Sequence, residues 1–310
     1  MITIKKLIFI ILILTGGLIL FIFAKEEPTP TKPIKEIVQP KDEHNIDDKT
    51  ASPEEQEEED IEVAVKVKED PIREFISDKL KKASSFFFTH DVNVVTLGDS
   101  LTEGSGDETN NSGYVGILDD TINQDKQVAQ FQNFAKRGSR SGQLLIRLED
   151  EDVTEALDNA DIVLITIGAN DIMQVFKENF TDLTLEKFTS EQIRYEQRLE
   201  NIFTKIQEIN GEADIYLIGF YNPFQEYFAD IEELEYIVDS WNQIGEDVTE
   251  KYSNVHYIPI KDLFDNAETN YFSDDNFHPN ALGYRLMANR ILQYVLDEGD
   301  GDEHTEATIQ

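Results

Sequence analysis

Short apolar segments alternate with longer segments of helical periodicity through the C-terminal two thirds of the chain. The short segments are rich in β-branched residues and occupy 92–98, 128–135, 161–168, 214–220 and 254–260. The clearest helical periods occupy 188–209, 229–252 and 280–296. Because fully apolar strands that alternate with helices are typical of parallel sheets covered on both faces, this pattern predicts an α/β fold. We expect a three-layer α/β/α sandwich with a five-stranded parallel sheet, formed by one domain over residues 91–296.

The N-terminal part of the chain contains an apolar segment without a charge, LIFIILILTGGLILFIFA, at residues 7–24. At about 1.5 Å per residue a helix of this length reaches roughly 27 Å, enough to cross a membrane. Lys5 and Lys6 precede the segment and mostly acidic residues follow it. We therefore expect a single-pass protein of the cell membrane, with residues 1–6 inside the cell and the domain extracytoplasmic. The alternative is a cleaved signal peptide and a secreted protein, but the apolar core is long and its end is a poor cleavage site.

Charged segments flank the predicted domain. Residues 25–70 contain five prolines and the run EEQEEED, and this composition cannot bury enough apolar surface to fold, so we expect a disordered acidic tether. Residues 71–90 have the apolar spacing of a short amphipathic helix that leads into the domain. Residues 297–310 are expected to form a disordered acidic tail. The acids of this tail lack the spacing of a calcium-binding loop, and we expect no metal site.

The composition excludes several classes of function. The net charge is −36, from 63 acidic and 27 basic residues, and it repels the phosphate backbone of nucleic acid. We therefore expect no nucleic-acid partner. The chain has no cysteine, which excludes disulfide bonds, thiolate catalysis and cysteine-based metal sites.

A candidate nucleophile follows the first predicted strand. In an open parallel sheet, functional side chains gather where the strands end at their carboxyl edge. Here the first strand runs into GDSLTEGSG, where Gly98 permits a sharp turn and Ser100 stands at the start of the next helix. The Ser100 hydroxyl would lie at the edge of the sheet, with its backbone N–H directed at the group that it attacks. The alternative is that Asp99 or Ser100 only caps the helix.

Two further strands end in groups that suit the binding of an oxyanion. The second strand runs into NFAKRGSRSG, where Gly138 allows a backbone N–H to approach a ligand closely, unless it is a plain loop glycine. The third runs into GANDIM, where the Asn170 amide is a donor that cannot titrate. Asp171 is expected to cap the next helix, and a turn followed by a cap is the alternative interpretation of GAND.

One histidine out of five lies on the carboxyl-edge side of the predicted sheet. The other four lie in the tether, before the first strand, within the last strand and in the tail: His44, His90, His256 and His304. His278 follows the last strand in DNFHPNALGY, three residues after Asp275, so one turn would bring the carboxylate to the imidazole. This pair is suited to a general base and its orienting partner. The alternative is that Asp275 and Pro279 only mark a turn into the last helix, which Pro279 is expected to open.

Together the stretches GDSLTEG, the glycine segment, GAND and DNFHPN resemble the ordered sequence blocks of the SGNH or GDSL hydrolase family over residues 91 to 295. With the apolar N-terminal segment and the acidic tether, the chain is most similar to membrane-anchored GDSL lipase/acylhydrolase proteins of Gram-positive bacteria. The resemblance implies a flavodoxin-like sheet, with Ser100 as nucleophile, His278 as base and Asp275 as its partner. It further implies an oxyanion hole formed by the Ser100 N–H, Gly138 and Asn170, with no cofactor.

The chain departs from the family pattern in one block, where Ala135 occupies a position that is commonly glycine in N-x-G-x-x-G. Gly138 remains the best match for the oxyanion donor, and Gly142 is the alternative.

The expected reaction is hydrolysis of a carboxylic ester through an acyl-enzyme, on a small or polymer-borne substrate. One alternative is an esterase that removes O-acetyl groups from cell-wall or other carbohydrate. A second alternative is a catalytically silent module that binds glycans or proteins. The sequence does not indicate an oligomeric state.

Overall fold

The computed structural model of the chain describes residues 92–224, 231–265 and 269–299. The predicted membrane anchor, tether and lead-in helix therefore lie outside the described residues. Within the described ranges, no helix combines the length and the apolar character that a membrane crossing requires.

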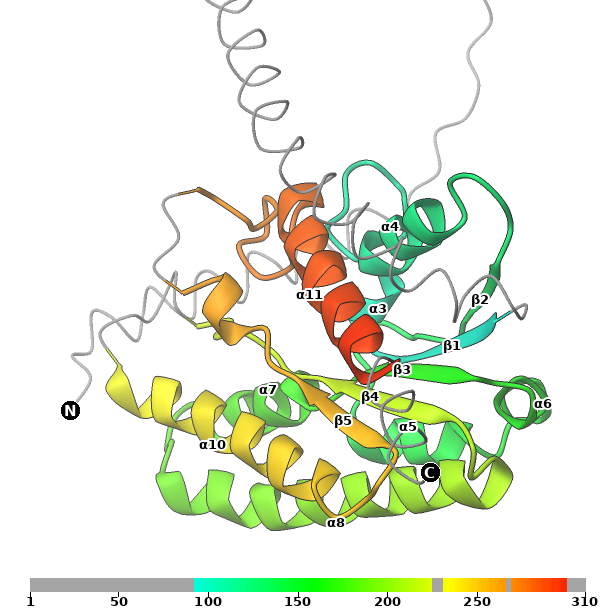
Figure 1. Cartoon of the computed structure of the whole chain (residues 1–310). Coiled ribbons are helices and arrows are strands. Elements are labelled where there is room, and N and C mark those ends of the chain that lie inside the picture. Colours follow the sequence, from blue (N-terminus) through cyan, green and yellow to red (C-terminus); the bar gives the residue numbers. More distant parts are fainter. Residues whose placement is uncertain (1–91, 225–230, 266–268, 300–310) are drawn as a thin grey trace, which may run out of the picture. The chain divides into compact units, whose positions relative to one another are not determined.

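Five parallel strands form one sheet in the order β2-β1-β3-β4-β5 (Figure 1). The strands are β1 (Val92–Gly98), β2 (Ala129–Asn133), β3 (Ile162–Thr166), β4 (Asp214–Ile218) and β5 (Val255–Ile258). The sequence predicted these five strands and their parallel pairing, and both are confirmed. In the register of the sheet, Gly98 at the end of β1 pairs with Thr166 at the end of β3. The segments that follow these two strands therefore leave the sheet side by side.

Helices cover both faces of the sheet. They are α3 (Ser100–Glu103), α4 (Gly113–Ile122), α5 (Ser141–Arg147), α6 (Glu151–Asp158), α7 (Ala169–Glu178), α8 (Leu185–Ile209), α10 (Glu232–Thr249) and α11 (Ala281–Gly299), with a 3₁₀ helix at Lys261–Leu263. Apolar side chains of α4 and α11 pack on one face, and those of α5 to α8 and α10 pack on the other (Figure 1). The α/β/α sandwich is therefore confirmed.

The alternation of side chains along each strand divides the core into two layers. In β3, Val163 and Ile165 belong to the layer under α8 and α10, whereas Ile162 and Leu164 belong to the layer under α4 and α11. All four side chains are at most 3% exposed. Because burial of each such side chain contributes about 1.5–3 kcal/mol, a central strand without polar positions stabilises both layers.

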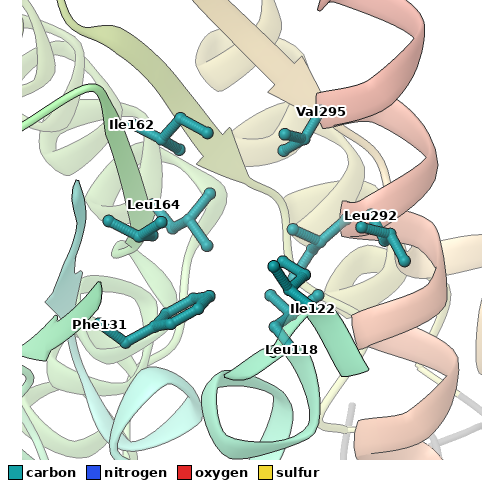
Figure 2. A pocket seen from close by; sticks show the side chains of 9 residues that line it. Leu118, Ile122, Phe131, Ile162, Leu164, Leu292 and Val295 are labelled. Atoms are coloured by element: carbon teal, nitrogen blue, oxygen red, sulfur yellow. The ribbon is translucent and has the colours of Figure 1, made fainter. Parts of the chain in front are cut away.

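An apolar hollow lies between α4, α11 and the sheet (Figure 2). Its lining comes from the sheet and the two helices: Val94, Leu118, Ile122, Phe131, Ile162, Leu164, Ile291, Leu292 and Val295. None of these side chains carries a polar group, and none belongs to the segments at the carboxyl ends of the strands. The hollow therefore has no groups that could carry out acid–base or nucleophilic chemistry.

Candidate active site

A sharp turn after β1 places Ser100 at the carboxyl edge of the sheet. Gly98 has φ +139°, and a Cβ at this position would lie 2.3 Å from the carbonyl oxygen of Thr166, so the turn requires glycine. Asp99 caps α3, since its carboxylate accepts a hydrogen bond from the backbone N–H of Leu101 at 3.0 Å. The capping role therefore falls to Asp99, and the hydroxyl of Ser100 is left available for another partner.

That partner is His278. Its Nε2 lies 3.0 Å from Ser100 Oγ, and its Nδ1 lies 2.6 Å from Asp275 Oδ2. Because the carboxylate accepts the proton on Nδ1, the neutral imidazole leaves Nε2 free to accept the hydroxyl proton of Ser100. Ser100 and His278 are both buried. The structure thus brings the three predicted residues together in the order that proton transfer from serine to histidine requires.

The turn before α11 holds the Asp275 carboxylate in place. Asp275 Oδ1 accepts hydrogen bonds from the hydroxyl of Ser273 and from the backbone N–H groups of Phe277 and His278. Partial burial alone would raise the pKa of Asp275, but the His278 imidazole and the two N–H groups hold it well below its ordinary value. The carboxylate therefore stays ionised beside the histidine, and the turn-forming and histidine-orienting roles of Asp275 coexist.

The prediction that Pro279 opens the last helix is wrong. Helix α11 begins at Ala281, and the side-chain oxygen of Asn280 accepts the backbone N–H groups of Leu282 and Gly283 in the manner of an N-cap. Pro279 instead lies in an antiparallel bridge with Phe272. This bridge closes the loop that carries Asp275 and His278.

The predicted oxyanion donors lie on neighbouring loops at the same edge of the sheet. Gly138 has φ +74° in an exposed loop, and a Cβ there would meet nothing within 4 Å. The Asn170 amide donates to the carbonyl of Ser139 at 3.1 Å and reaches Asp99 Oδ2 at 3.5 Å. Asn170 therefore lies between the Gly138 loop and the turn that carries Ser100. Gly142, by contrast, lies within α5.

Asp99 is a site residue that the sequence analysis considered only as a cap. Its Oδ1 also accepts the hydroxyl of Thr166 at 2.9 Å, and Thr166 is in turn bonded to the Thr102 hydroxyl at 2.8 Å. Burial raises the pKa of Asp99 to about 6, although its bonds from Leu101 and Thr166 counteract part of this effect. Because Asp99 binds both its own helix and the Asn170 amide, it joins the nucleophile turn to a candidate oxyanion donor.

A second buried network, which the sequence analysis missed, lies behind the oxyanion loops. Asp171 does not cap α7, whose N-cap is Gly168. Its carboxylate accepts the backbone N–H of Ser141 at 3.0 Å and the Ser141 hydroxyl at 2.7 Å. From α8, the Arg198 guanidinium donates to the Ser141 hydroxyl at 2.6 Å and to Asp171 at 3.1 Å. This network ties the segment after Gly138 to the residue after Asn170.

Helix α8 supports the same loops at a second position. The hydroxyl of Tyr195 donates to the carbonyl of Ile167 at 3.0 Å, and a Cβ at Gly168 would lie 2.6 Å from that hydroxyl oxygen. Tyr195 and Arg198 are three residues apart and so share one face of α8. Nothing in the sequence near Arg198 distinguishes it from the other charged residues of this amphipathic helix.

The described residues contain no group of three or more histidine and acidic side chains placed to hold a metal ion.

Comparisons with known proteins agree on one family. The profile of the GDSL-like Lipase/Acylhydrolase family matches residues 96–286. The chain is 39% identical over 210 residues to YpmR, an uncharacterized protein of Bacillus subtilis, covering 66% of this chain and 82% of YpmR. It is 29% identical over 204 residues to the spore germination lipase LipC of Bacillus licheniformis, covering 63% of this chain and 92% of LipC.

Solved structures of lipases and esterases share the fold. The lipase Lip_vut3 from a goat rumen metagenome has a TM-score of 0.58 at 24% identity, covering 64% of this chain and 95% of that one. A catalytic mutant of Axe2, an acetylxylan esterase from Geobacillus stearothermophilus, has a TM-score of 0.51 at 19% identity, covering 66% and 94%.

Proposed function

This chain belongs to the GDSL-like Lipase/Acylhydrolase family and is a serine hydrolase acting on ester bonds, and we propose that Ser100, His278 and Asp275 carry out the reaction. The observation that carries the proposal is the continuous hydrogen-bonded chain from Ser100 Oγ through the imidazole to the Asp275 carboxylate. Membership of a hydrolase family sets aside the alternative of a catalytically silent binding module.

In the acylation step, His278 Nε2 takes the proton of Ser100 as Oγ attacks the carbonyl carbon of the ester. The carbonyl oxygen becomes an oxyanion, and the imidazole becomes a cation that the ionised Asp275 stabilises. When the tetrahedral intermediate collapses, the bond to the leaving alcohol breaks. Nε2 donates its proton to the departing oxygen, and the acyl group stays on Ser100.

In the deacylation step, His278 takes a proton from water, and the resulting hydroxide attacks the acyl carbon. The imidazolium then returns the proton to Ser100 Oγ as the acid leaves, which restores the resting state. The two steps use the same base and the same oxyanion site, so one arrangement of groups serves both.

The oxyanion site in this proposal consists of the Ser100 and Gly138 backbone N–H groups and the Asn170 amide. Donors aimed at the charge that develops in the transition state lower the barrier without binding the ground state more tightly. The support for this assignment is the placement of Asn170 between the Gly138 loop and the Ser100 turn, through its contacts with Ser139 and Asp99.

We propose that the enzyme acts outside the membrane, on carboxylic esters. The support for this location is the uncharged segment 7–24 with lysines before it and acidic residues after it. A fusion of a reporter enzyme to the C-terminus tests it: an extracytoplasmic reporter such as alkaline phosphatase should be active, and activity of a cytoplasmic reporter instead would contradict it.

The O-acetyl groups of extracellular carbohydrate are a second candidate substrate. The observation that favours them is the open Gly138 loop, where nothing lies within 4 Å of a Cβ, so a bulky alcohol group has room beside the nucleophile. The apolar hollow between α4 and α11, in contrast, includes none of the site residues and offers no acyl site beside Ser100 (Figure 2).

Hydrolysis of p-nitrophenyl acetate by the wild-type protein and by Ser100→Ala tests the reaction. Release of nitrophenol that disappears in the variant supports the proposal, whereas equal rates would sink it. A series of longer p-nitrophenyl esters and acetylated xylan then separates the two candidate substrates. Release of acetate from xylan, with rates that fall along the ester series, would favour the carbohydrate ester.

A further inference from the structure

One stretch of this strongly acidic chain is basic. Residues 126–148 contain no acidic residue, although 63 of the 310 residues of the chain are acidic. The same stretch holds five bases: Lys126, Lys136, Arg137, Arg140 and Arg147. A solvated surface segment would share the acidic character of the rest of the chain, so the reversal of charge asks for a local reason.

The centre of this stretch is the loop that carries Gly138. Lys136, Arg137 and Arg140, here called the 136–140 cluster, lie between the end of β2 and the start of α5. The backbone N–H of Lys136 donates to the carbonyl of Gly98 at 3.0 Å, so the loop adjoins the nucleophile turn. The cluster therefore lies at the edge of the proposed active site.

The cluster differs from the other bases in its lack of partners. Across the described part of the chain, most bases elsewhere form ion pairs with acidic side chains: Lys187, Arg194, Arg198, Lys251, Lys261 and Arg290. In that same part, none of the three cluster side chains forms an ion pair. Lys136 and Arg137 are exposed, and Arg140 is half-buried. These cations are thus available to a ligand.

One acidic residue, Glu103 at the end of α3, faces the loop. Its carboxylate accepts the backbone N–H of Arg137 at 3.3 Å and the hydroxyl of Ser105 at 3.0 Å. Glu103 therefore fixes the backbone of the loop but forms no ion pair with the Arg137 guanidinium. Its charge opposes that of the cluster, which makes it a useful probe.

We infer that the 136–140 cluster binds an anionic group of the ester substrate, a carboxylate or a phosphate close to the bond that is cleaved. This inference rests on the proposed function, because it names the substrate class of the same site. The net charge of the chain repels anions in general. Unpaired guanidinium and ammonium groups beside Gly138 attract an anion at this one place, and a guanidinium matches the two oxygens of a carboxylate or phosphate. The enzyme therefore favours anionic esters over neutral ones of the same size.

The test compares two matched esters, p-nitrophenyl hydrogen glutarate, which carries a free carboxylate, and its uncharged amide analogue. We expect the wild-type protein to show a higher kcat/KM for the anionic ester. Arg137→Gln and Lys136→Gln should each lower the ratio of the two kcat/KM values about threefold, the usual size for one exposed charge pair, with the neutral ester unaffected. Glu103→Gln should raise the ratio.

Lys177→Gln is the matched control, because Lys177 is an exposed base at the far end of α7 and should leave the ratio unchanged. A ratio of one or less in the wild type, or a ratio that the Lys136 and Arg137 variants do not move, would overturn the inference. Hydrolysis of the neutral ester by the wild type but not by Ser100→Ala would show that the proposed function survives such a failure.

Short-chain phospholipids distinguish a lipid headgroup from a soluble anion. The probes are monomeric dihexanoyl phosphatidylglycerol, which is anionic, and dihexanoyl phosphatidylcholine, which is zwitterionic. A preference for phosphatidylglycerol that Arg137→Gln abolishes would support the inference with a lipid source. A preference confined to the soluble glutarate ester would support it with a solute source. No preference in either pair would contradict it.

Discussion

The imidazole Nε2 of His278 lies 3.0 Å from the hydroxyl oxygen of Ser100, although 178 residues separate the two along the chain. The parallel sheet produces this contact, because β1 and the segment after β5 both deliver their following loops to its carboxyl edge. The alignment of His278 depends in turn on Asp275, whose two carboxylate oxygens have separate tasks.

Asp275→Asn should separate these two tasks. The side-chain oxygen of asparagine can still accept the N–H groups of Phe277 and His278, so the turn and the melting temperature should change little. The charge that stabilises the imidazolium is lost, and kcat should fall on the order of 10²–10⁴. Ester hydrolysis and thermal melting of the purified variant measure the two effects.

Asp274→Asn serves as the control, since Asp274 is the exposed neighbour of Asp275 and should tolerate the change in both assays. A variant of Asp275 that melts early yet keeps full specific activity would assign this residue to the turn alone.

Asn170→Ala should remove one oxyanion donor. We expect kcat to fall on the order of 10²–10³ with KM nearly unchanged, because the lost bond forms only as negative charge develops on the carbonyl oxygen. Asn179→Ala is the control, since Asn179 donates its amide to a backbone carbonyl at the other end of α7. A rise in KM at constant kcat would assign Asn170 to substrate binding.

Arg198→Gln should impair catalysis without any contact between Arg198 and the proposed reacting groups. The variant loses the donors to Ser141 and Asp171 that hold the two oxyanion loops together. Because small displacements of catalytic groups are costly, we expect a loss of about tenfold in kcat, with partial recovery in Arg198→Lys.

Arg194→Gln provides the comparison on the same helix, because Arg194 pairs with Glu191 at the surface and does not reach Asp171. Combining Arg198→Gln with Asn170→Ala should then cost less than the product of the two single effects, since both act through one donor. Effects that multiply in full would mean that Arg198 supports stability alone.

Asp99 should make the stability of the protein depend on pH. Its pKa is raised to about 6, from an ordinary value of 3.8, by burial. The folded state therefore holds a proton that the unfolded state has released, and stability that is present below pH 4 is lost as the pH rises through 6. Relative to the wild type, the unfolding free energy of Asp99→Asn should increase by up to about 3 kcal/mol between pH 4 and pH 7. Denaturant melts of both proteins across this range measure the difference, and curves that stay parallel would contradict the shifted pKa.

Much of the fold followed from apolar patterning. The β-branched strands and their helical neighbours predicted the parallel sheet, since a central strand such as β3 is buried on both faces and cannot hold polar residues. The same logic placed Ser100, Asn170 and His278 at one edge, because each follows the end of a strand. Helix boundaries were less certain: the Asn280 cap starts α11 later than Pro279 suggested.

The supporting network could not be predicted from local sequence. Asp171 looks like a helix cap in GAND, and only the tertiary structure shows its carboxylate on Ser141 and Arg198. Arg198 lies 27 residues away on a separate helix, and no local pattern encodes that distance. The basic character of residues 126–148 is visible in the sequence, but its meaning depends on the position of Gly138 beside the nucleophile turn.

The most direct test of the central claim is covalent labelling of the nucleophile. The full-length protein is treated with a fluorophosphonate, whose phosphorus forms a bond to the serine oxygen and expels fluoride, and the adduct is located by mass spectrometry of its peptides. We predict a single adduct on Ser100, loss of ester hydrolysis in proportion to labelling, and slow labelling of His278→Gln. Full labelling at another residue, or complete adduct formation on Ser100 without loss of activity, would contradict the account.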